Sequence, residues 1–268
     1  MEEDIDRVEF AGEYLRFKSL SFEQIMAITR GPRPDYRSAF YGDAGLKQRF
    51  IERAADHKKA DQIQHGVYWT LGEAWNKESG QYAPKLHGCA VGCLSHAGER
   101  AHQVLSRLTN VPQALYQLTD TLFESQSILI AGLDKALPGD IMAAIPVGSD
   151  QSETHYRVMA RLAEKSEAIL SDWHRRKLVS TLTSDAPIAT KFAVLQEAVT
   201  NNPELKSYGI TTLFWDRFCR GYNPVEVRQI LLEELRNAPV PVVEKPEEQQ
   251  TMAAFMTTFV MENEKVTV

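Results

Sequence analysis

Residues 87–96 read HGCAVGCLSH and lie at the centre of the stretch around which the rest of the chain is organised. The wider stretch from His57 to His102 contains two of the three cysteines and five of the seven histidines. Thiol and imidazole groups bind transition metals and serve as catalytic groups. We therefore predict the functional centre in this stretch, within a segment that Gly88 and Gly92 make unusually thin.

On both sides of this stretch, apolar residues recur at helical spacing. Residues 44–69 carry a broad apolar face, and Val111-Pro112 begins a helix whose buried stripe is predicted to be Leu115, Leu118, Leu122 and Phe123. Residues 5–17 are interpreted as a helix and residues 71–86 as a loop. We find no convincing run of period-two alternation and no tight hairpin signal. The predicted fold class is an all-α, multi-helix globular bundle.

Pro138-Gly139 and Pro146-Val147-Gly148 interrupt the helical pattern and predict two helical lobes that divide near residue 148. The N-terminal lobe, 1–148, contains the His/Cys motif, and the C-terminal lobe is 149–238. The last part, 239–268, begins with the Pro/Glu-rich PVPVVEKPEEQQ, which indicates an extended linker. A short apolar docking helix is predicted after it.

Composition restricts the class of protein. The chain has 268 residues, of which 43% are hydrophobic and 25% are charged, as in soluble globular proteins. The net charge of −6 argues against a surface that binds nucleic acid over its whole extent, because phosphate binding needs positive charge. The basic run Trp173–Lys177 leaves a nucleotide or nucleic-acid ligand open, although we favour a solvated helical face.

No long apolar run predicts a membrane partner, and the acidic N-terminus, MEEDIDRVEF, is unlike a secretory signal. Three cysteines, an odd number, do not indicate a disulfide framework. We expect a cytoplasmic protein with reduced thiols.

Cys89, Cys93 and His96 are spaced i, i+4, i+7, so on a helix they would share one face. Thiolate and imidazole ligands suit zinc or another transition metal, and we predict these three residues as metal ligands. Two alternatives use the same atoms. The small residues could serve only to let helices pack closely, or Cys89 could be a nucleophile with His96 or His57 as its base.

His57, Asp61 and His65 are spaced i, i+4, i+8, which on a helix also places them along one face. From there His57 or Asp61 could supply a fourth metal ligand, as could His87, or a carboxylate could orient a histidine. We predict His57 and Asp61 as the catalytic residues. A solvated polar face is the alternative, because lysines and glutamines surround them.

The motif GCAVGC (88–93), together with Tyr41-Gly42, 57–61, 66–69, His96 and 118–124, resembles a family of uncharacterised proteins encoded by phages and bacterial mobile elements. The resemblance covers residues 41–124. It implies a phage-related context and a joint site formed by His57, Asp61, Cys89, Cys93 and His96, with no assigned activity.

Two functions follow as expectations. The first is a helical metalloprotein, perhaps a metal-dependent hydrolase, in which a bound ion activates water. The second is a non-enzymatic interaction protein that binds a host protein or defence component. The phage-related context, the acidic charge and the apolar segment after the linker favour the second.

Overall fold

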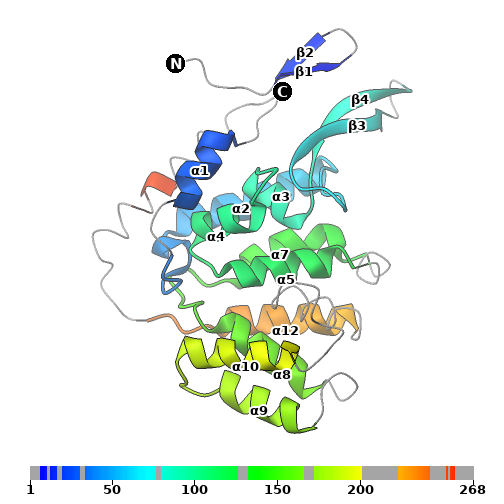
Figure 1. Cartoon of the computed structure of the whole chain (residues 1–268). Coiled ribbons are helices and arrows are strands. Elements are labelled where there is room, and N and C mark those ends of the chain that lie inside the picture. Colours follow the sequence, from blue (N-terminus) through cyan, green and yellow to red (C-terminus); the bar gives the residue numbers. More distant parts are fainter. Residues whose placement is uncertain are drawn as a thin grey trace.

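The computed structural model describes residues 7–10, 13–16, 20–30, 34–76, 80–125, 132–165, 172–200, 223–241, 252 and 254–256. This part of the chain is mainly helical, as predicted (Figure 1). Its helices are α1 (Phe22–Arg30), α2 (Ala44–Lys59), α3 (Ala90–Ser95), α4 (Ala101–Thr109), α5 (Gln113–Phe123), α7 (Leu137–Ala144), α8 (Thr154–Glu164), α9 (Asp172–Leu182), α10 (Ile188–Thr200) and α12 (Pro224–Arg236), with the short 3-10 turns η1 (Ala39–Gly42) and η2 (Asp134–Ala136).

The prediction of a purely helical protein is wrong, because the described residues include two antiparallel hairpins. Strand β1 (Arg7–Phe10) pairs with β2 (Glu13–Arg16), and β3 (Thr70–Asn76) pairs with β4 (Gln81–His87). The first hairpin replaces the helix predicted over 5–17, and the second replaces the loop predicted over 71–86.

The residues that indicated a loop in 71–86 are compatible with a two-stranded ribbon. Pro84 lacks an N–H, but each strand of such a ribbon has an open edge where none is needed. Gly80 has φ of +64° and supplies the left-handed residue that the turn requires.

The helices are stacked in successive layers (Figure 1). Helices α2, α3 and α4 lie above α5 and α7, and α12 and α8 lie below them, followed by α9 and α10. Capping side chains fix where some helices begin. Asp43 accepts hydrogen bonds from the N–H groups of Gly45 (2.7 Å) and Leu46 (3.1 Å) at the start of α2, and Asn223 caps α12 just before Pro224.

The buried apolar residues form one continuous cluster that crosses the predicted boundary near residue 148. It contains Phe50 and Phe123 from the first predicted lobe and Leu178 and Leu195 from the second. Helix α12 contacts both α7 and α8. The division into two lobes stays a prediction, and the two parts share buried contacts.

Of the predicted C-terminal linker and docking helix, 242–251, 253 and 257–268 lie outside the described residues. Met256 is buried in the core cluster, and Met252 packs against it. Within the described residues, none of the helices is long and apolar enough to cross a membrane.

Candidate metal centre

The segment 89–96 does not form the single ligand face that its spacing predicts. Helix α3 covers only Ala90–Ser95. Cys89 is its N-cap with extended backbone (φ −65°, ψ 178°), and His96 is its C-cap in the left-handed region (φ 53°, ψ 29°). Since neither end residue has helical dihedral angles, the helical projection that aligned Cys89, Cys93 and His96 does not apply.

Gly88 and Gly92 allow a close backbone contact. A Cβ at Gly88 would lie 2.5 Å from the carbonyl oxygen of Tyr68, and one at Gly92 would lie 2.7 Å from the carbonyl carbon of the same residue. The N–H of Cys89 also donates to the carbonyl of Val67 at 2.6 Å. The glycines of the motif therefore bring residues 67–69 directly against the start of α3.

Cys93 belongs to the packing. Its side chain is fully buried, and its thiol donates to the carbonyl oxygen of Gly88 at 3.2 Å. Burial raises the pKa of the Cys93 thiol to about 12. Cys93 thus fits the alternative in which the small residues of the motif let helices pack closely.

His57 and His96 meet in the interior. Their Nε2 atoms are 2.8 Å apart, and both rings contact Trp69, which stacks on His96 at a centroid distance of 4.6 Å. The Nδ1 atom of His57 lies 2.6 Å from Oε1 of Gln62. Because that amide oxygen can only accept, His57 carries its proton on Nδ1, and its Nε2 accepts from the Nε2–H of His96.

Asp61 is not part of this group. Helix α2 ends at Lys59, and Asp61 has φ of +55°, so the chain leaves the helical face before Asp61. Its carboxylate is 62% exposed and forms ion pairs with Lys85 and Lys135. The structure brings His57 to His96 and does not bring Asp61 to His57.

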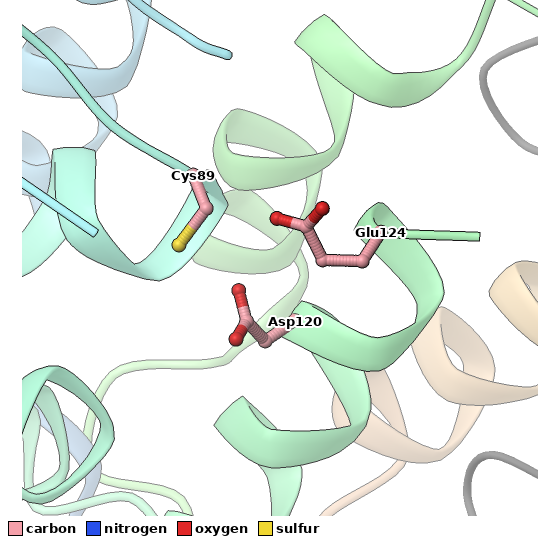
Figure 2. Close-up of side chains that lie close together, drawn as sticks. All are labelled: Cys89, Asp120 and Glu124. Atoms are coloured by element: carbon pink, nitrogen blue, oxygen red, sulfur yellow. The ribbon is translucent and has the colours of Figure 1, made fainter. Parts of the chain in front are cut away.

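A different set of side chains converges on Cys89. The group consists of Cys89, Asp120 and Glu124, whose possible ligand atoms all lie within 4.8 Å of one another. It is the only group of three or more Cys, His, Asp or Glu residues within this distance among the described residues. Figure 2 shows the carboxylates of Asp120 on α5 and of Glu124 at the C-terminal end of this helix, opposite Cys89 at the start of α3. We call these three residues the Cys89 cluster. Cys89, Cys93 and His96 form no such group.

Two histidines border the Cys89 cluster. The Nε2 atom of His102, on α4, lies 3.1 Å from Oδ2 of Asp120. His65 stacks on Phe123 and lies between two acids, 3.6 Å from Glu124 and 3.2 Å from Asp134. Both carboxylate oxygens of Glu124 also accept from the N–H of Gly66 at 3.0 Å. Asp120 and Glu124 are thus held in place by neighbouring donors.

The Cys89 cluster is electrostatically crowded. Burial raises the pKa of the Cys89 thiol strongly, and the neighbouring Asp120 carboxylate raises it further. Burial also raises the pKa of Glu124, with a further contribution from Asp120 against the lowering effect of the Gly66 N–H. A cation would favour the deprotonated form of all three groups.

The sequence did not lead us to predict Asp120 or Glu124 as ligands, and it led to no assigned role for His65 or His102. One signal was present in the sequence, since Asp120 and Glu124 are spaced i, i+4 in a predicted helix and so lie on one face. The basic run on α9 is largely paired within the chain: Arg175 with Asp172, and Lys177 with Glu197.

No protein-family model, curated protein or solved structure matches this chain.

Proposed function

We propose that the protein is a metal-binding hydrolase whose ion is held by Cys89, Asp120 and Glu124. The observation that carries this proposal is the convergence of one sulfur and two carboxylate groups within 4.8 Å. Three protein ligands leave a position for water, which a bound ion would activate for hydrolysis.

The ligand set favours a thiophilic ion. Magnesium and calcium prefer oxygen ligands alone, whereas zinc and cobalt accept thiolate together with carboxylate. His102 would act as an orienting partner, because it holds Asp120 through Oδ2. His57 and His96 lie outside this ligand set.

The raised pKa of the Cys89 thiol disfavours the alternative in which Cys89 is the nucleophile, since the attacking species is the thiolate. An ion bound to the sulfur removes this difficulty, because a coordinating thiol loses its proton. The same chemical group is therefore better suited to ligation than to nucleophilic attack.

Cobalt(II) titration of the metal-stripped protein, prepared without an affinity tag, tests the proposal. A cobalt ion bound to Cys89 would give a thiolate-to-cobalt charge-transfer band in the near ultraviolet. We expect this band in the wild type, its loss in Cys89→Ser, and its weakening in Asp120→Asn and Glu124→Gln.

Cys93→Ser is the matched control, because Cys93 is buried four residues away and lies outside the Cys89 cluster. It should keep the band. A band that persists in Cys89→Ser, or its absence from the wild type, contradicts the proposed centre. Hydrolysis is tested separately with zinc-loaded protein and a panel of 4-nitrophenyl esters and anilides, on which Glu124→Gln should be inactive.

A further inference from the structure

Tyr68 lies beside the Cys89 cluster. Its backbone is in contact with Gly88 and Gly92, on either side of Cys89. Its ring meets the ring of His102 edge to face, at a centroid distance of 5.5 Å and an interplanar angle of 87°. His102 in turn holds Asp120. Tyr68 is 38% exposed and Cys89 only 1%, so Tyr68 is open to solvent whereas the thiol is not.

The acids of the Cys89 cluster act on the Tyr68 phenol. Burial and then the charges of Asp120, Cys89 and Glu124 raise the pKa of Tyr68 to about 12. The backbone contact with Gly88 and Gly92 and the ring contact with His102 place Tyr68 beside the candidate ligands. With its pKa raised, the phenol keeps its proton at neutral pH. A neutral phenol is a hydrogen-bond donor.

The charge of the site favours an uncharged ligand. Three ionised ligands around a divalent ion leave a net charge of about −1, which repels phosphate and carboxylate groups. The neighbouring Val67 is also 36% exposed and adds an apolar surface next to Tyr68.

We propose that Tyr68 is a substrate-binding residue, which donates a hydrogen bond from its phenol to the carbonyl oxygen of an uncharged acyl compound, an ester or an amide, bound at the ion. This inference rests on the proposed metal centre. It assigns a substrate class to that centre and a role to a residue that ligates no ion.

The test uses full-length, cobalt-loaded wild type, Tyr68→Phe and Tyr82→Phe, with acetamide as a neutral carbonyl probe and inorganic phosphate as an anionic one. Binding is followed by the change in the cobalt spectrum. Tyr82 is a matched control because it is an exposed tyrosine on β4. We expect Tyr68→Phe to bind acetamide about 3- to 10-fold more weakly, as for one lost hydrogen bond. Tyr82→Phe should behave as wild type, and phosphate should bind more weakly than acetamide.

The outcomes separate the two proposals. If the wild type binds no cobalt, the metal centre and this inference both fail. If all three proteins bind cobalt and acetamide equally well, only the role of Tyr68 fails. Loss of cobalt binding in Tyr68→Phe would mean that Tyr68 supports the ligands, which overturns its assignment to substrate. Tighter binding of phosphate overturns the substrate class.

Discussion

At the residue scale, the bond between His57 and His96 requires His57 Nε2 to be unprotonated. Burial lowers the pKa of His57, which is 8% exposed. The unfolded chain therefore binds a proton at this residue more readily than the folded one. The contribution of His57 to stability is fully present above its unfolded pKa of about 6.5 and is lost as the pH falls below that value.

We expect the melting temperature of the wild type to fall between pH 7.5 and pH 5, and His57→Phe to show a shallower dependence over the same range. His155, whose pKa burial lowers to about 3, contributes in the same direction and remains in both proteins. His174→Gln on α9 is the control and should keep the wild-type slope. Equal slopes in wild type and His57→Phe would contradict the prediction.

Gly92 offers a second test at this scale. An alanine Cβ there would lie 2.7 Å from the carbonyl carbon of Tyr68, and backbone cannot give way as a flexible side chain can. We expect Gly92→Ala to lower the free energy of unfolding by about 1–3 kcal/mol, the usual range for overpacking. Denaturant unfolding measures it.

Gly139→Ala provides the contrast. Its Cβ would meet only Ala54, at 3.8 Å, and the residue lies inside α7. Alanine favours a helix interior over glycine by up to about 1 kcal/mol, so this variant should be as stable as wild type or more so. A loss of stability in Gly139→Ala as large as that in Gly92→Ala would refute the close-contact explanation.

At the element scale, Asp61 connects secondary-structure elements and has no catalytic partner in the described structure. It follows the end of α2 and pairs with Lys85 on β4 and Lys135 in η2. Exposed ion pairs contribute about 0–1 kcal/mol each. We therefore expect Asp61→Ala to change the free energy of unfolding by no more than about 1 kcal/mol and to bind cobalt as wild type does. Loss of cobalt binding in Asp61→Ala would restore the role that its spacing suggested.

The sequence predicted long elements better than short ones. Asn223-Pro224 begins α12 as its capping chemistry requires, and the apolar stripe of α5 is buried as its period indicates. The four-residue strands β1 and β2 contain too few alternations to distinguish from a helical pattern. Pro84 and the glycines of 71–86 concealed β3 and β4, because a ribbon with open edges tolerates them.

The candidate site shows the same limit. His65, Cys89 and His102 all fall within the stretch 57–102 that the sequence marked. The predicted site combined the wrong residues, because α2 and α3 end sooner than their patterns suggested. Residues beyond the end of a helix no longer lie on the helical face that their spacing predicts. The two carboxylates come from α5, and only the packing of α5 against α3 brings them to Cys89.

At the scale of the whole molecule, the shared core predicts cooperative unfolding. Leu178 and Leu195 belong to the same buried cluster as Phe50 and Phe123, across the predicted lobe boundary. We expect far-ultraviolet circular dichroism and tryptophan fluorescence to give one coincident transition in denaturant. Two separated transitions would instead support lobes that fold independently near residue 148.

Residues 68 and 69 are neighbours in the chain, yet Tyr68 meets His102 beside the Cys89 cluster and Trp69 meets His57 and His96. Two adjacent residues thus contact two separate groups of histidines. A deletion of one residue just before Tyr68 would shift the register of the chain by one. Trp69 would then take the place of Tyr68, and Thr70 would take the place of Trp69. This short stretch should therefore accept an exchange of side chains far more readily than any change in its length.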